Sequence, residues 1–419
     1  MEENITRRTK LAELMDENSI AIIYSGVSKI ATEDEFYPFK VNNHFFYLTN
    51  VQQENSILVL VKEIGRVKTY LFIDEYNEVV EKWTGRTLSD DEAKELSNID
   101  SIYHTKDFES FIPLFFASEN NQYGKISKLY IDLTPELKIK DAYSTLDFKK
   151  EIEEKYPHIA IENVYPIITD LRMVKSDYEI KQLQEAIKLT KAGINDLISK
   201  VGKGMFEYEL ANEFSYFGMA HGRHGLAFDT IVASGKSAVI LHYPQQTERV
   251  MRGDLVLFDL GYSYNGYNAD VSRTYPVNGK FNPLQREIYE AVLNCNRAVI
   301  EYIHEGLTLM DLQKFSMEVL KNECVKRGLL KEEDDIRRVY YHGISHHLGL
   351  DTHDASERTK PLANGHVITV EPGLYFKEYG IGVRIEDDVL VKDGVACVLT
   401  SSITKDPDEI EKIMATLGN

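Results

Sequence analysis

Short runs of apolar and β-branched residues alternate with longer mixed segments over roughly the first 170 residues. The runs have the length of β-strands, and they cover residues 19–24, 55–61, 68–73 and 128–132, with a last run inside 151–170. The mixed segments between them suit helices. We therefore expect a smaller α/β domain over residues 1–170.

A strong helix start follows at Ser176. Ser176 and Glu179 form a capping box, in which the serine oxygen accepts from the third helical N–H and the glutamate reaches back. Apolar residues then recur at helical spacing as far as Gly202. We place the boundary between two domains at this helix, with the second domain over residues 171–419. A helix inside one continuous domain is the alternative.

The second half mixes helices with strands. Asn282 and Pro283 predict the start of a helix that ends near Gly306, and a further helix is expected over 310–327. Strands are expected at residues 239–242, 255–260, 367–371, 382–386 and 389–391. The fold class indicated for this half is therefore α+β.

Acidic residues interrupt or end several of these apolar runs. They are Asp259, Asp270, Glu371 and Glu386. A single carboxylate in an apolar run is most often a satisfied structural acid, because burying an unpaired charge is costly. Several in successive strands need a common counter-charge, and a divalent metal is the simplest one.

Histidines gather in the segment 342–354, which holds four of the twelve in the chain. His342 and His346 have the spacing of a zinc-binding helix, but Gly343 and Gly349 disfavour a helix there. A site on strands and loops is therefore predicted. His242 ends another apolar run, where a lone histidine is most often a core or surface residue.

The four acids carry four negative charges, and His346 offers a neutral imidazole. Two divalent cations would balance the acids, and a bridging hydroxide would complete their coordination shells. Paired metals about 3.5–4 Å apart are a recurrent hydrolytic device. Oxygen-rich ligation favours Mn²⁺ over a thiolate-bound zinc. The residues alone thus indicate a hydrolase with two metal ions.

Composition excludes several other classes of protein. Hydrophobic residues make up 43% and charged residues 27%, as in ordinary globular proteins. The net charge of −19 argues against nucleic acid or an anionic membrane as partner. No apolar run approaches the ~18 residues of a membrane helix. The first residues lack an apolar signal core, and the three cysteines are widely spaced, so a reduced, cytoplasmic protein is expected.

From about Leu171 onward the chain resembles the pita-bread metallopeptidases, which include methionine aminopeptidase, prolidase and aminopeptidase P. The ligand order Asp, Asp, His, Glu, Glu of that family falls on Asp259, Asp270, His346, Glu371 and Glu386. The segments 276–281, 342–346 and 406–411 are most similar to the Xaa-Pro aminopeptidase branch, and 36–39 and 45–49 resemble its N-terminal domain. The resemblance implies a pita-bread catalytic domain after a smaller α/β domain.

The resemblance also implies roles for the ligands. Asp270 and Glu386 would bridge the two metals, Asp259 would hold one, and His346 the other. Glu371 would bind a metal and carry the proton of the bridging water to the leaving proline nitrogen, as a carboxylate beside the nucleophile can do.

Further residues would surround the reacting bond. His353 would donate to the carbonyl oxygen as it gains charge. His242 and His342 would line the proline side of the cleft. Arg384 would orient the network or the downstream end of the peptide, and Tyr375 would contact the site. The alternatives are packing roles for His342 and Tyr375 and a structural pairing of Arg384 with an aspartate.

Neighbouring residues complete the comparison with the family. His347 and Asp354 are expected to be structural or supporting, and Asp387 and Asp388 structural or exposed. Two departures stand out: Phe228 occupies a place where relatives carry tyrosine, and Thr352 replaces an aliphatic residue. Neither removes a ligand.

The activity implied is that of a metallo-aminopeptidase that releases the N-terminal residue from peptides with proline second. Proline lacks the amide N–H and has a fixed φ, so this bond needs a dedicated site. Prolidase, which cuts only Xaa-Pro dipeptides, is the alternative enzyme, and a non-catalytic binding protein on the same fold is the alternative of another class. Creatinase shares the fold but works without metals. The resemblance suggests a dimer or tetramer.

Overall fold

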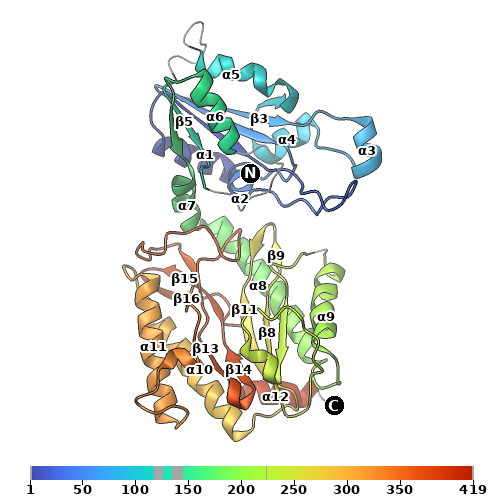
Figure 1. The fold of residues 1–419 in the computed structure, drawn as a ribbon, viewed down its shortest axis with the longest axis vertical. Helices are drawn as coiled ribbons and strands as arrows, with labels where there is room; N and C mark the ends of the chain where they lie inside the picture. Colours follow the sequence, from blue (N-terminus) through green and yellow to red (C-terminus); the bar gives the residue numbers. More distant parts are fainter. Residues whose placement is uncertain (1, 118–125, 135–144, 223, 418–419) are drawn as a thin grey trace. The chain divides into compact units, whose positions relative to one another are not determined.

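The computed structural model describes residues 2–117, 126–134, 145–222 and 224–417 (Figure 1). The chain divides into two compact units, Met1–Arg172 and Met173–Asn419. That residues 1–170 and 171–419 are separate folding domains stays a prediction.

A six-stranded sheet forms the centre of the first unit. Its strand order is β4-β3-β2-β1-β5-β6. The strands are β1 (Ser19–Tyr24), β2 (Ile57–Glu63), β3 (Arg66–Ile73), β4 (Ser101–His104), β5 (Lys128–Ile131) and β6 (Ala160–Asn163). β2 runs antiparallel to β1 and β3, whereas the other three pairs, β3–β4, β1–β5 and β5–β6, are parallel. The predicted strands of this α/β unit are thus confirmed, with boundary shifts of a few residues.

Helices connect these strands. They are α1 (Glu2–Leu14), α2 (Asn43–Thr49), α3 (Glu78–Thr84), α4 (Asp90–Ser97), α5 (Phe108–Phe116), α6 (Thr145–Lys155) and α7 (Tyr165–Met173). Apolar side chains of the sheet, such as Phe72, pack against apolar side chains of α5 and α6, such as Phe115 and Phe148. Trp83, the one tryptophan of the sequence, lies on α3 with 84% of its surface exposed.

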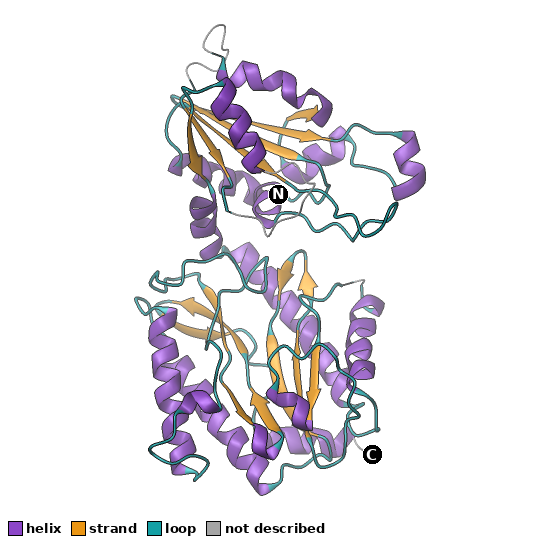
Figure 2. Cartoon of the chain, in the orientation of Figure 1, coloured by secondary structure: helices purple, strands orange, loops and turns teal. Residues whose placement is uncertain are grey.

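Five long helices surround the strands of the second unit (Figure 2). They are α8 (Asp177–Ile198), α9 (Glu207–Ala220), α10 (Pro283–Tyr302), α11 (Leu309–Lys326) and α12 (Pro407–Leu417). The capping box at Ser176 is present, because its hydroxyl accepts from the Glu179 N–H at 3.3 Å and the Glu179 carboxylate accepts from the Ser176 N–H at 3.1 Å. The predicted starts of α8 and α10 are confirmed to the residue.

The strands of the second unit form two three-stranded sheets and two short pairs. One sheet has the order β11-β8-β7, from β7 (Ile231–Ser234), β8 (Leu255–Leu260) and β11 (Val271–Pro276). The other has the order β12-β15-β16, from β12 (Val367–Val370), β15 (Asp387–Lys392) and β16 (Val395–Val398). The pairs join β9 (Ser263–Tyr264) to β10 (Tyr267–Asn268), and β13 (Gly373–Phe376) to β14 (Ile381–Arg384). The mixture of strands and helices confirms the α+β class.

A main-chain contact brings the two halves of this unit together. The Glu386 N–H donates to the Ser272 carbonyl at 3.0 Å, which places the segment between β14 and β15 beside β11. Since Asp259 on β8 lies opposite Ser272 in the β8–β11 register, acids from distant parts of the sequence meet at this point.

The strand predicted at residues 239–242 is wrong. Residues Gly235–Val239 form a short 3₁₀ helix instead, and a turn follows. The backbone hydrogen bond that ends this helix is local: the Ile240 N–H donates to the Ser237 carbonyl at 3.0 Å. β14 packs against this turn so closely that a Cβ on Gly382 would lie 1.9 Å from the Ala238 oxygen. Within the run, Val239 and Leu241 are partly buried, whereas Ile240 is 49% exposed and His242 is exposed, so its apolar residues indicate neither a strand nor full burial.

Candidate active site

A cavity of about 650 Å³ opens in the second unit, and it contains the predicted chemistry. All five predicted ligands line it: Asp259, Asp270, His346, Glu371 and Glu386. So do His242, His342, His353 and Arg384. Tyr375 does not line the cavity, although it contacts residues that do. A larger, open groove of about 1160 Å³ lies on the first unit and includes none of these residues.

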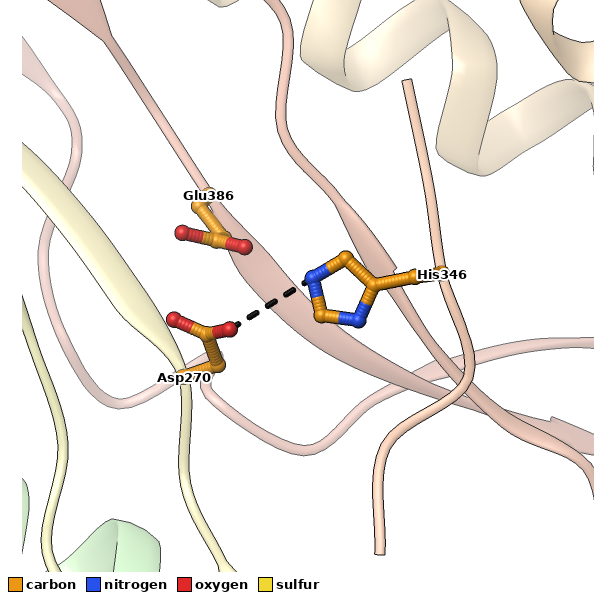
Figure 3. A group of neighbouring side chains, drawn as sticks. All are labelled: Asp270, His346 and Glu386. Carbon is orange, nitrogen blue, oxygen red and sulfur yellow. Dashed lines mark ion pairs between the residues drawn. The ribbon is translucent and has the colours of Figure 1, made fainter. Parts of the chain in front are cut away.

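Asp270, His346 and Glu386 form the tightest group (Figure 3). One ligand atom from each lies within 4.8 Å of the others. The His346 Nε2 atom is 3.5 Å from the Asp270 carboxylate. The His346 Nδ1–H donates to the His347 carbonyl at 3.0 Å, so the lone pair of Nε2 points at the acids.

Glu371 and Asp259 approach this group from two other strands. Glu371 follows β12, and its two oxygens lie 3.6 Å from His346 Nε2 and 3.6 Å from His342 Nδ1. Asp259 lies on β8, and its Oδ2 accepts from Arg384 at 2.6 Å. The other Asp259 oxygen, Oδ1, is buried and has no hydrogen-bond partner.

The carboxylates of the site lie so close together that they raise one another's pKa values. Burial and the neighbouring acids raise the pKa of Asp270 and of Glu371 well above their ordinary values. Burial and the Asp259 charge raise the pKa of Glu386 to about 8. Burial, with the charge of His353, lowers the pKa of His346 to about 4, so its imidazole is neutral at pH 7.

This donor set fits two divalent cations. Four carboxylates and a neutral imidazole are hard oxygen and borderline nitrogen ligands. Among the described residues, Arg384 is the one lysine or arginine that lines the cavity. The unpartnered oxygen of Asp259 and the raised carboxylate pKa values both indicate a missing positive charge.

Arg384 supports the site through three hydrogen bonds. It donates to Asp259 at 2.6 Å, to the Tyr375 hydroxyl at 3.0 Å and to the Ser272 hydroxyl at 2.8 Å. The Tyr375 hydroxyl in turn lies 2.8 Å from His342 Nε2. Burial, with the charge of Arg384, lowers the pKa of His342 to about 3, so this ring accepts from Tyr375. Arg384 thus joins Asp259, Tyr375 and Ser272 at the cavity wall.

Two supporting residues were not among the candidates. The Ser272 hydroxyl donates to Glu386 at 2.8 Å, and the Thr369 hydroxyl accepts from the His346 N–H at 3.1 Å. Ser272 could have been found, since it lies two residues after Asp270 and strand alternation gives both the same face. Nothing in the sequence pattern singles out Thr369.

The remaining cavity lining combines histidines with apolar and neutral polar residues, among them Leu226, Leu241, Thr230 and Gln246. The rings of His346 and His353 pack edge to face with centroids 4.4 Å apart. His242 is exposed on the turn after the 3₁₀ helix. Phe228 and Thr352, the two departures from the family pattern, both line the cavity, and the Thr352 hydroxyl donates to the Ala227 carbonyl at 3.3 Å.

Sequence comparisons identify the class of protein. Residues 181–393 match the model of metallopeptidase family M24, and residues 5–123 match that of the aminopeptidase P N-terminal domain. The chain is 31% identical to a Xaa-Pro aminopeptidase of Haemophilus influenzae, covering 99% of this chain and 97% of the relative. The chain therefore belongs to metallopeptidase family M24.

Solved structures agree with this assignment. Aminopeptidase P from E. coli with the inhibitor Pro-Leu superposes with a TM-score of 0.90 at 31% identity, covering 100% of this chain and 98% of that one. A structure from Bacillus anthracis reaches a TM-score of 0.94 at 39% identity, covering 99% and 98%. The predicted pita-bread fold and the resemblance to Xaa-Pro aminopeptidases are thus confirmed.

Proposed function

We propose that this chain removes the N-terminal residue from peptides whose second residue is proline. The observation that carries the proposal is one cavity that brings together Asp259, Asp270, His346, Glu371 and Glu386. The nearly full-length similarity to Xaa-Pro aminopeptidases supports the same activity.

Two divalent ions, which we propose to be Mn²⁺, would be held by these five residues. Asp270 and Glu386 would bridge the ions, Asp259 would bind one and His346 the other. When bound, the ions would lower the pKa of water and polarise the scissile carbonyl. The neutral Nε2 of His346 and the free Oδ1 of Asp259 support this distribution.

The chain's own residues would move the protons. Glu371 would take a proton from the attacking water and deliver it to the proline nitrogen, which must be protonated to leave. His353 would donate a hydrogen bond to the carbonyl oxygen as negative charge develops there. Arg384 would hold Asp259, and Tyr375 would hold His342, so that neither side chain turns away from the cavity.

Recognition of proline would depend on shape, because the ring has no N–H to read. His242 and His342 would form the wall on the proline side. Phe228, Leu226 and Leu241 give the cavity an apolar surface for the adjoining side chain. Of these, Phe228 presents an aromatic ring without a hydroxyl.

The experiment that tests the proposal compares an Xaa-Pro-Xaa tripeptide with the Xaa-Pro dipeptide, each with added Mn²⁺. We expect turnover of the tripeptide, with release of its first residue. Turnover of the dipeptide alone would make the protein a prolidase. A chelated sample is the control, and a protein that neither binds metal nor cuts either peptide would be a binding protein on this fold.

Location and assembly are proposals of a different kind. None of the helices among the described residues is long and apolar enough to cross a membrane. We propose a cytoplasmic protein, on its net charge and widely spaced cysteines, and a dimer or tetramer, on the family resemblance. Light scattering coupled to size-exclusion chromatography measures the assembly directly.

A further inference from the structure

The loop from His346 to Asp354 carries two residues of the proposed reaction but contains no helix or strand. His346 begins the loop and His353 lies near its end. Their rings pack at an interplanar angle of 75° with centroids 4.4 Å apart. A shift in one end of the loop would therefore change the position of the other imidazole.

Hydrogen bonds give this loop part of its shape. The Asp354 N–H donates to the His347 carbonyl at 2.9 Å and closes the loop on itself. Asn268, on the strand that leads to Asp270, donates from its backbone to Gly349 at 2.9 Å and from its side chain to Leu350 at 3.1 Å. The loop is thus tied to the segment that carries a proposed bridging ligand.

A buried ion pair fixes the far end of the loop. Lys175 Nζ lies 2.9 Å from Asp354 Oδ2, and each side chain is only 1% exposed. The second oxygen, Asp354 Oδ1, accepts from the Asp351 N–H at 3.2 Å. One carboxylate therefore shapes the loop internally and joins it to a lysine 179 residues away in the sequence.

The surrounding backbone is built around this pair. A Cβ on Gly349 would lie 2.4 Å from Asp354 Oδ2 and 3.1 Å from Lys175 Cε, so the glycine backbone covers the pair directly. The Lys175 N–H donates to the Gly365 carbonyl at 2.8 Å, which anchors the lysine next to the start of β12. Lys175 is therefore held at its backbone as well as at its ammonium group.

Stability alone is a weak reason for such a pair. Desolvating two charges costs about as much as their attraction returns, and a well-packed apolar pair is often as stable. What an ion pair adds is a defined geometry, because the buried ammonium and the buried carboxylate each need the other as partner. The position of His353, next to Asp354, is the part of the site that depends on that geometry.

We propose that Lys175 is a positioning residue, which acts through Asp354 to hold the loop so that the His353 imidazole faces the reacting carbonyl. This inference rests on the proposed function, because it assigns His353 its place in that reaction. The lysine lies outside the cavity lining, so it would act through Asp354 and not by direct contact with the peptide.

The test is a double-mutant cycle between Lys175→Met and His353→Ala, measured on an Xaa-Pro-Xaa tripeptide with Mn²⁺. Lys175→Met alone should lower kcat by about 10- to 100-fold with little change in KM, as expected for a misplaced catalytic group. In the His353→Ala background the same change should cost less than about twofold, because the group that it positions is gone. Full additivity of the two losses would overturn the proposal.

Lys188→Met is the matched control, because Lys188 lies on α8 with its side chain 77% exposed. It should leave kcat, KM and Mn²⁺ binding unchanged. Lys175→Met should also bind Mn²⁺ like the wild type, and loss of the metal would overturn the proposal by showing that the pair holds the proposed ligand His346, not His353 alone. If Lys175→Met does not fold, Asp354→Asn enters the same cycle, since it removes the charge and keeps the size.

A readout without activity separates this inference from the proposed function. In protein with isotope-labelled histidine, Lys175→Met should shift or broaden the NMR signals of the His353 ring and leave those of His304, which lies outside the cavity lining, unchanged. An unchanged His353 signal would refute the positioning role. Wild-type protein that cuts no peptide would refute the proposed function, and the His353 signal would still decide the question of positioning.

Discussion

At the scale of single residues, the order of carboxylates along the sequence carried most of the information. Asp259 and Glu371 were identifiable because each adjoins an otherwise apolar strand, where an unpaired charge would be costly. The link between Lys175 and Asp354 could not be predicted, because ion pairs between distant residues leave no periodic pattern in the sequence. Individual roles for the predicted site residues stay predictions until variants are measured.

Tyr375→Phe should lower kcat/KM about tenfold while metal content stays unchanged. Without the hydroxyl, His342 Nε2 loses its donor and Arg384 loses one acceptor, and buried polar groups without partners cost roughly 1–3 kcal/mol each. Steady-state kinetics and metal analysis check this. Tyr379→Phe, at an exposed tyrosine, should change neither quantity. Wild-type kcat/KM in Tyr375→Phe would contradict the orienting role.

At the scale of elements, capping residues predicted the helices well and apolar composition predicted the strands less well. Ser176 and Asn282 cap the first turns of α8 and α10 through local hydrogen bonds, and such capping boxes have a recognisable sequence pattern. The segment 239–242 does not form a strand, because its backbone hydrogen bond is local, from the Ile240 N–H to the Ser237 carbonyl, and it pairs with no neighbouring strand of the described residues. An apolar run therefore predicts a strand only where a second strand is available to pair with its backbone.

Strand alternation also places the side chains of two adjacent acidic residues on opposite faces, one at the cavity and one in the core. Glu386 faces the cavity, while Asp387 faces Arg273 at 2.8 Å and accepts from Thr400. Burial acts to raise the pKa of Asp387, but Arg273 and Lys405 hold it well below the ordinary value. Of the two expectations for Asp387, structural or exposed, the structural one applies, because the side chain is fully buried in an ion pair.

Arg273→Met should destabilise the protein by about 3–5 kcal/mol, because it leaves the buried carboxylate of Asp387 with one cation fewer. The guanidinium also donates to the carbonyls of Ile403 and Thr404, which would lose these partners. Urea unfolding followed by circular dichroism measures the loss. Arg337→Met, in an exposed pair with Asp335, should cost less than about 1 kcal/mol. Equal effects of the two changes would contradict this account.

At the scale of the whole molecule, the pattern of apolar runs and the helix start at Ser176 indicated an α/β half followed by an α+β half, and one family model matches part of each. The strand orders could not be predicted, since they depend on which apolar faces meet. We expect residues 1–170 and 171–419 to behave as separate folding units. Limited proteolysis that releases two stable fragments would support this boundary, and uniform degradation would contradict it.

Removing metal should lower the melting temperature, because the cavity carboxylates lose their counter-charge. At free Mn²⁺ about 100 times the Kd, binding adds about 2.7 kcal/mol of stability. For a unit of this size, each kcal/mol of added stability raises the melting temperature by roughly 2–4 °C. Thermal melts of metal-free protein, with and without Mn²⁺, measure the shift.

Asp270→Ala is the matched variant for these melts. It removes a carboxylate that contacts His346, so its melting temperature should respond little to Mn²⁺. It should also lose nearly all activity with the fold retained. An equal response of wild type and variant would place the Mn²⁺ binding elsewhere on the protein.

The single tryptophan decides which spectroscopic signal can follow these events. Trp83 belongs to the first unit, whereas the metal site lies wholly in the second. Its indole is already in water, so its emission would change little even when α3 unfolds. The second unit contains no tryptophan, so no indole of its own lines the cavity to report metal loading or unfolding there. A tryptophan introduced at Phe228, in the cavity lining, would supply the missing optical reporter.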